Sequence, residues 1–165
     1  MIVKPCAEFR ADFPDDHIEE DGEIVRFGGL NVAEAIADIL VGFGCTVEGI
    51  AGDFRGWWCG FRFEGLALIF QLVDLGDHYV FVCEEPLRAR PDYDLFLHAL
   101  LNIDSRLKAD SRFHDLLWYS YANRPGESPS ESPVTGELPP ISKIKKKRGL
   151  LGRLLAPMMA RPQID

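Results

Sequence analysis

Recognisable catalytic and ligand-binding motifs are missing from this 165-residue sequence. It contains no G-x-G-x-x-G before a helix, no G-x-x-x-x-G-K-[ST], no G-x-S-x-G and no H-E-x-x-H. Those patterns bind dinucleotides or phosphates, present a nucleophilic serine, or hold zinc. We therefore expect a protein that is not an enzyme and that carries no cofactor.

Cysteine is also scarce, and its spacing does not match the usual metal and redox motifs. The four cysteines, Cys6, Cys45, Cys59 and Cys83, lie far apart and form no C-x-x-C pair. In a reducing compartment such residues are typically small buried hydrophobic side chains rather than disulfide partners. The four histidines show no metal-ligand spacing either, so we expect no metal site.

Long hydrophobic runs are the third absence. No stretch reaches the roughly 18 apolar residues of a membrane span, and residues 1–16 hold no apolar run of signal-peptide length. We therefore expect a cytoplasmic protein, whose contact with a membrane, if there is one, is peripheral.

Basic residues are few in the first three quarters of the chain. Residues 1–122 contain 22 acidic and 10 basic residues, whereas residues 123–165 contain 4 acidic and 8 basic ones. An acidic body repels phosphate backbones, so nucleic acid is not an expected partner. The same charge accelerates the encounter with a basic protein, although solubility alone is an alternative reason for it.

Composition divides the chain into three parts. Residues 1–122 have the apolar content of one acidic α+β domain with its own core. Residues 123–140 are mostly proline, glycine, serine and glutamate, which predicts a flexible, disordered linker. Residues 141–165 form a basic amphipathic tail.

Apolar residues recur at helical spacing in two segments. The first predicts a helix from Val32 to Phe43, with Asn31 as its N-cap and Gly44 just beyond its C-terminus. The second predicts a helix from about Asp92 to Leu107. Each apolar stripe is expected to pack on a sheet.

Alternating patterns predict the strands of that sheet. They are Glu23–Phe27, Thr46–Asp53, Trp57–Glu64, Leu66–Val73 and His78–Cys83, with a last strand favoured within Arg112–Ala122. The short connections after Thr46 permit only antiparallel neighbours, which is a β-meander. Residues 1–22 are expected to form an irregular arm or a short edge element. The fold class is therefore α+β, an antiparallel meander with two helices on one face.

Side-chain alternation gives the strand around the two tryptophans two different faces. Trp57, Cys59, Phe61 and Phe63 share one side, which is expected to lie under the helices, and Trp58 lies on the other. The next strands are apolar on both faces. We therefore expect the N-terminal arm, the tail, a second copy of the chain or another partner to cover the second face.

The candidate binding site follows from that second face. Tryptophan and arginine are enriched at interface hot spots. The expected contacts to a protein partner are therefore Trp58, Arg62, Glu64, Asp53 and Arg55. Two alternatives stay open: Trp58 is an ordinary packed residue under the N-terminal arm, or the strand ends near Asp53, Arg55 and Trp58 form an enzyme site.

The tail combines positive charge with a one-sided apolar pattern. Its expected contact residues are Lys145, Lys146, Lys147, Arg148, Leu151, Leu154 and Leu155. This composition is typical of a helix on an anionic membrane surface, and equally of a docking peptide for a protein groove. A third alternative is an inert tail, or one that docks on the acidic body of the same chain.

The pattern NVAEAIADILVGFG, residues 31–44, followed by GDFRGWWCGFRFEG, residues 52–65, resembles small acidic bacterial immunity proteins of toxin systems. Secretion-chaperone-like α+β domains are similar in general layout. The resemblance covers about Glu23 to Ala122 at the level of architecture, and the tail has no counterpart in it. It implies a stoichiometric inhibitor of a basic toxin. The alternative is a homodimeric chaperone or adaptor whose tail contacts a client or a membrane.

Overall fold

The structure, a computed structural model, describes residues 2–85, 93–120 and 128–134 of the chain. Its elements are β1 (Cys6–Ala11), β2 (Ile18–Glu20), β3 (Glu23–Arg26), α1 (Leu30–Gly42), β4 (Thr46–Asp53), β5 (Gly56–Phe63), β6 (Leu66–Asp74), β7 (Tyr79–Glu84), α2 (Tyr93–Ala109) and β8 (Phe113–Tyr119). Six strands form one antiparallel sheet in the order β4-β5-β6-β7-β1-β8, and β2 pairs with β3 in a separate hairpin. The α+β class is therefore confirmed.

The predicted meander is present in β4 to β7. These four consecutive strands pair antiparallel with their neighbours, and their ends lie within one residue of the predicted ones. The final strand is also found, as β8, on the other side of β1. Short turns specified this order because a tight reversal can join only adjacent antiparallel strands.

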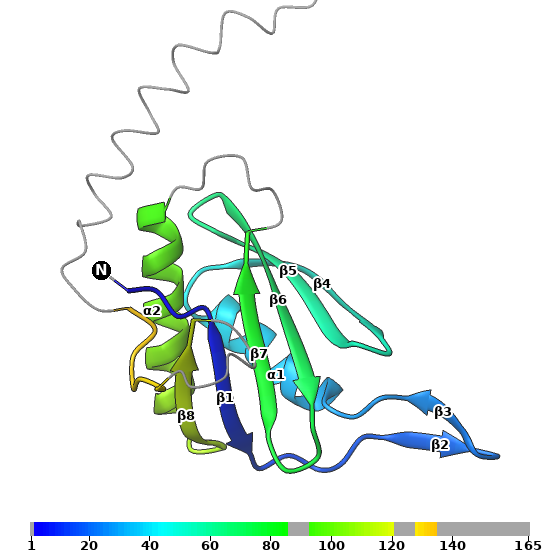
Figure 1. The fold of residues 1–165 in the computed structure, drawn as a ribbon. Helices are drawn as coiled ribbons and strands as arrows, with labels where there is room; N and C mark the ends of the chain where they lie inside the picture. The colour runs from blue at the N-terminus through cyan, green and yellow to red at the C-terminus, as the bar shows by residue number, and fades with distance from the viewer. Residues whose placement is uncertain (1, 86–92, 121–127, 135–165) are drawn as a thin grey trace, which may run out of the picture.

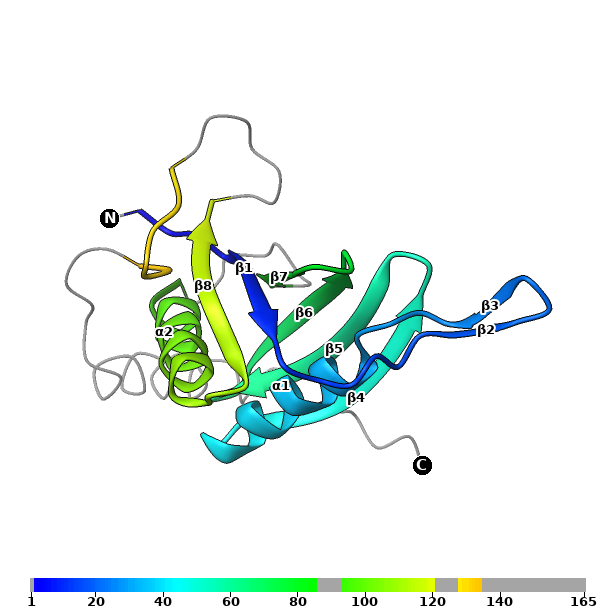
Figure 2. The ribbon, with the colours of Figure 1, turned by 90° about the horizontal axis from the view of Figure 1, so that it is seen from below.

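Both helices lie on the same face of the sheet (Figures 1 and 2). α1 packs on β4 and β5, α2 packs on β8, and the two helices contact each other. Cys59, Phe61 and Phe63 of β5 are buried on this face. Trp57 faces the same way but is only half-buried, at the rim of the core, where its Nε1 donates to the carbonyl of Gly28 at 2.9 Å.

The prediction of an irregular arm or edge element at the N-terminus is wrong. Residues 6–11 form an interior strand, β1, between β7 and β8, in which Ala7 is paired with both Phe81 and Trp118. Ala7 and Phe9 are buried on the helix-covered face. The partner strands lie far along the chain, so no local turn signal points to this pairing.

The strand predicted at residues 23–27 exists, but it is neither half-buried nor part of the sheet. Residues 23–26 pair with β2 across the two-residue turn Asp21-Gly22, whose φ angles of 52° and 80° are both positive. Two positive φ angles are the pattern of a type I′ turn, for which Asp-Gly is a preferred sequence. This dipeptide is the signal for the hairpin, and the expectation of an irregular arm overlooks it.

A short stretch of the predicted linker, residues 128–134, lies against the edge strand β8. Ser130 and Trp118 exchange both backbone hydrogen bonds, at 2.8 and 3.0 Å. The indole Nε1 of Trp118 donates to the Asp104 carboxylate at 2.7 Å, and Lys108 joins that carboxylate at 2.8 Å. Lys108 also donates to a backbone carbonyl of the 128–134 stretch. The outer edge of β8 is therefore partly covered by the chain itself.

The other predictions for the C-terminal part stay predictions. The rest of residues 123–140 and the whole tail, residues 141–165, lie outside the described residues. In the described part of the chain, no helix combines the length and the apolar character of a membrane span.

All four cysteines are buried and none forms a disulfide, which leads to a first prediction. Burial raises the pKa of Cys45 to about 12 and that of Cys59 to about 11, and it also raises the pKa of Cys83. A raised thiol pKa leaves little thiolate at pH 8, and the thiolate is the reactive form. A thiol-specific chromogenic disulfide should therefore react with none of the four in the folded protein and with all four in guanidinium. Rapid reaction of any thiol in the folded protein would contradict this.

Candidate functional site

Three of the five predicted contact residues come together at the turn between β4 and β5. Asp53 and Arg55 form an ion pair of 2.7 Å between Oδ2 and Nη2. The Cζ atom of Arg55 lies 5.5 Å from the ring centroids of both Phe54 and Trp58. Its guanidinium lowers the pKa of the Asp53 carboxyl, and Asp53 raises the pKa of Arg55, so both groups are charged at neutral pH.

The Trp58 indole lies on the sheet face opposite the helices, as alternation predicts. On the neighbouring strands it is flanked by Ala51 and Gln71, and the Nε2 of Gln71 donates to the carbonyl of Arg55 at 2.8 Å. Its own Nε1 is buried and completes no hydrogen bond with the described residues. It is nevertheless close enough to Asp53 to help lower the pKa of that carboxyl. The predicted cover by an N-terminal arm is not seen: residues 6–11 form β1 within the sheet, and none of residues 2–22 lines the hollow beside Trp58.

The other two predicted contact residues lie elsewhere. Arg62 is near the far end of β5, where its Nε pairs with the Glu48 carboxylate at 2.8 Å. Glu64 occupies the turn between β5 and β6 with a positive φ of 49°. Neither residue joins the group at the β4–β5 turn, because five and seven residues of extended chain separate them from Trp57. The sequence pattern showed that Trp58 and Arg62 share a face, but four strand positions already place them about 13 Å apart, which the prediction of one contact site did not take into account.

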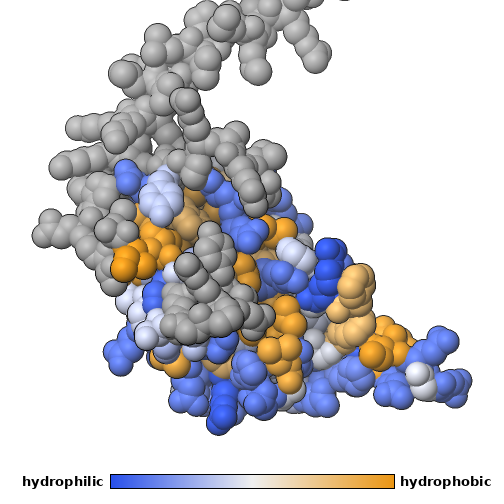
Figure 3. All heavy atoms as spheres, viewed as in Figure 1, coloured by the Kyte–Doolittle hydropathy of each residue, from blue (hydrophilic) through white to orange (hydrophobic). Residues whose placement is uncertain are grey.

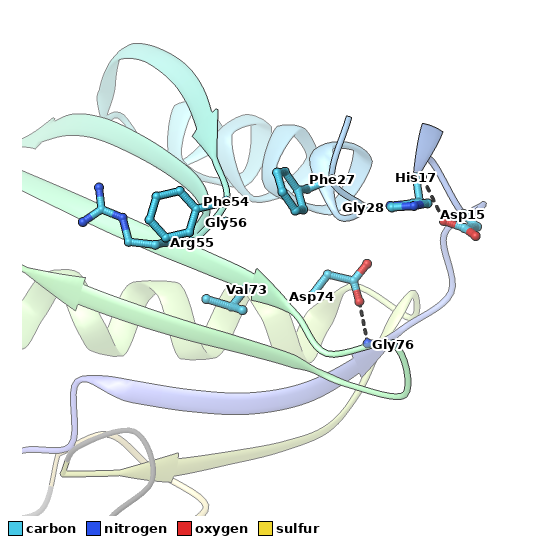
Figure 4. A pocket seen from close by; sticks show the side chains of 10 residues that line it. All are labelled: Asp15, His17, Phe27, Gly28, Phe54, Arg55, Gly56, Val73, Asp74 and Gly76. Carbon is cyan, nitrogen blue, oxygen red and sulfur yellow. Dashed lines mark hydrogen bonds between the residues drawn. The ribbon is translucent and has the colours of Figure 1, made fainter. Parts of the chain in front are cut away.

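A cleft of about 330 Å³ opens beside the β4–β5 turn. It is lined by Asp15, His17, Phe27, Gly28, Phe54, Arg55, Gly56, Val73, Asp74 and Gly76. The rings of Phe27 and Phe54 stand on one side, with Val73 and Asp74 across from them (Figure 4). Three separate segments therefore meet here, and we call residues 15–28, 53–56 and 73–78 the hairpin end.

Exposed apolar side chains gather at the hairpin end. Phe54 is 77% exposed on the β4–β5 turn, and Leu75 is 52% exposed on the β6–β7 turn. On β3, Ile24 is 50% and Val25 is 58% exposed. Adjacent strand residues point to opposite sides, so neither face of the hairpin is packed on the domain. Apolar surface over the β4–β5 turn and the adjoining β2–β3 hairpin is visible in Figure 3. We call these four residues the apolar cluster.

Acidic residues are concentrated in the same three segments as the apolar cluster. The hairpin end contains nine acidic residues, six in 15–28, one in 53–56 and two in 73–78, against the two arginines Arg26 and Arg55. The pKa of the partly buried Tyr79 is raised to about 12, mainly by burial and further by the nearby carboxylates of Asp74, Asp16 and Asp15. Asp15 and Asp74 accept backbone N–H groups of His17 and Gly76. The apolar cluster is therefore spread over the two faces of the hairpin and the two neighbouring turns, among acidic residues of the same three segments.

Asp16 connects the hairpin to the domain. Its buried carboxylate accepts the backbone N–H groups of Gly29 at 2.7 Å and Asn31 at 2.6 Å, and its backbone carbonyl accepts the Nε of Arg26 at 2.8 Å. The N-cap of α1 is Gly29, which has no side chain that could cap the helix. The prediction that Asn31 caps the helix is wrong: Asn31 lies inside α1, and a carboxylate from another segment satisfies the free N–H groups there.

The two charged groups beside Trp58 pair with each other. A hollow of about 320 Å³ beside Trp58 is lined by Ala51, Gly52, Asp53, Arg55 and Trp58. In the described ranges, no group of three or more His, Cys, Asp or Glu side chains is arranged to hold a metal ion. The arrangement is an exposed phenyl ring, Phe54, at a cleft that Asp15 and Asp74 also line.

The role of Asp16 can be tested by the substitution Asp16→Asn. An amide can accept only through its oxygen, so its NH₂ group would face a backbone N–H and leave a buried donor unsatisfied. We expect the free energy of unfolding, measured with urea, to fall by roughly 1–3 kcal/mol. The matched control is Asp15→Asn at the exposed neighbour, which should stay within about 0.5 kcal/mol of wild type. Equal stabilities of the two variants would contradict the capping role.

The chain was compared with protein-family models, curated proteins and solved structures, and none of the three comparisons found a match. A function for the chain therefore rests on the geometry of the hairpin end.

Proposed function

We propose that this chain is a non-enzymatic protein-binding module whose hairpin end binds a basic partner protein. The observation that carries the proposal is the apolar cluster, Ile24, Val25, Phe54 and Leu75, exposed among nine acidic residues on three segments that meet at one cleft. Exposed apolar groups that gather on one surface and are rimmed by polar residues are typical of interaction sites.

Phe54 has the properties of an anchor. It is the most exposed of the large apolar side chains in the described residues, and it stands beside Arg55 and the cleft. Burying such a side chain against a partner contributes about 1.5–3 kcal/mol. The carboxylates around it add orientation and speed of encounter rather than most of the affinity, because rim charges remain solvated.

The open faces of the β2–β3 hairpin favour a protein partner over a small-molecule ligand. A two-stranded hairpin is marginally stable in water without further packing. Both faces of this one are open, and apolar Ile24 and Val25 point in opposite directions. A partner that encloses the hairpin would bury both side chains, which a small molecule in the cleft would not do.

More specifically, we propose that the partner is a basic toxin or a secreted client, which the module neutralises by binding it stoichiometrically. The support is charge: a strongly acidic body is electrostatically complementary to a basic surface and repels nucleic acid. If this form is correct, equimolar addition of the protein should abolish the activity of the purified partner.

Phe54→Ala tests the proposed surface. The full-length protein is used to capture a partner from extracts of its native host, and the partner is then purified and titrated by calorimetry. Because Phe54 is exposed, its removal should leave the melting temperature within the range of a neutral surface change. The dissociation constant should nevertheless rise by about ten-fold or more, as for an interface anchor.

The matched control is Val41→Ala. Val41 lies on α1 away from the cleft, and its side chain, like that of Phe54, is more than half exposed. This variant should bind like wild type. Binding should also weaken as salt is raised, because solvent-exposed charges are screened within about 10 Å at 0.1 M. Equal affinities of wild type and Phe54→Ala for the captured protein would refute the proposed surface.

A further inference from the structure

We infer that the basic tail of this chain, residues 141–162, docks on the hairpin end of its own domain. The first argument is charge. The tail carries seven basic residues and no acidic ones, whereas the hairpin end carries nine acidic residues and two arginines. Of the seven large apolar side chains exposed in the described residues, four, Ile24, Val25, Phe54 and Leu75, lie at this anionic end, so it offers both chemistries that the tail requires.

The second argument is the order of the two chemistries in the tail. The basic run, residues 143–148, is followed directly by apolar pairs at Leu150–Leu151, Leu154–Leu155 and Met158–Met159. At the hairpin end, Asp15 and Asp74 line the same cleft as Phe27 and Phe54, so carboxylates and apolar rings are also adjacent there. A segment with adjacent cationic and apolar parts can therefore pair its charges with these carboxylates while its apolar residues cover the cluster.

The third argument is reach. The described chain ends at Val134, which bridges Val3, and from there 14 residues lead to Arg148. Extended chain spans about 3.3–3.6 Å per residue, so this length reaches roughly 50 Å. A folded domain of about 130 residues has a radius of gyration of about 14 Å and is roughly 36 Å across. A path over such a surface to the opposite side is about 57 Å, which the 17 residues from Val134 to Leu151 span when extended. The apolar part of the tail can therefore reach any side of a domain of this size, and the basic run can reach most of it.

Tethering makes even a weak contact effective. Composition predicts a flexible connection, and such a connection holds the two surfaces at an effective concentration on the order of 1 mM. A contact with a dissociation constant of about 0.1 mM would then be occupied for about 90% of the time. One consequence rests on the proposed function, and the docking itself does not. If a partner binds the hairpin end, the docked tail would lower the apparent affinity for that partner by about ten-fold. The tail is then an autoinhibitory segment that a basic partner displaces.

Paramagnetic labelling of the full-length chain tests the docking without any partner. A nitroxide is attached at Ala156→Cys, since the native thiols are buried and should not react. With the nitroxide active, amide signals of Val25, Phe54 and Gly76 should lose intensity, while those of Val41 and Thr46 should not. Replacing Lys145, Lys146 and Lys147 by glutamate should restore the lost signals, and replacing them by arginine, the charge-conserving control, should not.

The docking is overturned if the signals of the hairpin end are unaffected, if the loss is the same at Thr46, or if the glutamate variant behaves like the arginine variant. A mixture of spin-labelled chain with unlabelled, isotope-enriched chain distinguishes a contact within one chain from a contact between two copies. Signal loss that appears undiminished in the mixture would show that the tail binds a second copy, and this would also overturn the inference. Because no partner is present, these results are independent of the Phe54→Ala titration.

Discussion

One buried carboxylate joins the hairpin end of this molecule to the rest of the domain. Asp16 accepts two backbone N–H groups at the start of α1, and the carbonyl of the same residue holds Arg26 at the base of the hairpin. The helix N-terminus is an anion site by its own geometry, because its free N–H groups and its dipole both favour negative charge. Here the occupant comes from the chain itself. The hairpin, the cleft and the first turn of α1 therefore share one anchor.

The turn that carries Phe54 depends on a second set of local contacts. The Asp53 carboxylate holds the side chain and the backbone N–H of Arg55, and Gln71 from β6 holds the carbonyl of Arg55. Gly56 completes the turn with a positive φ of 117°, where an added Cβ would lie 2.2 Å from the carbonyl oxygen of Leu72. Phe54 thus lies on a turn held by several hydrogen bonds, which under the proposed function would lower the entropy lost on binding.

The candidate site could be predicted from the sequence only in part. Composition indicated an acidic body, and alternation placed Trp58 on the face away from the helices, next to the turn that holds Asp53 and Arg55. Periodicity could not show that Arg62 pairs with Glu48 at the far end of its strand. It also gave no indication of the apolar cluster, because a single exposed Phe or Leu in a turn has no pattern. The cluster exists only through the meeting of three segments.

The sequence by itself determined the local elements of this protein. Helical spacing specified α1 and α2, and period-2 alternation with short turns specified the meander, because these signals depend on residues only a few positions apart. Only the tertiary structure decided that β1 enters the sheet between β7 and β8, that Asp16 caps α1, and that the hairpin stands apart from the sheet. Those outcomes join residues distant in the chain. Segments far apart in the chain come together because they compete for burial and hydrogen bonds over the whole domain. No pattern of neighbouring residues predicts the outcome of that competition.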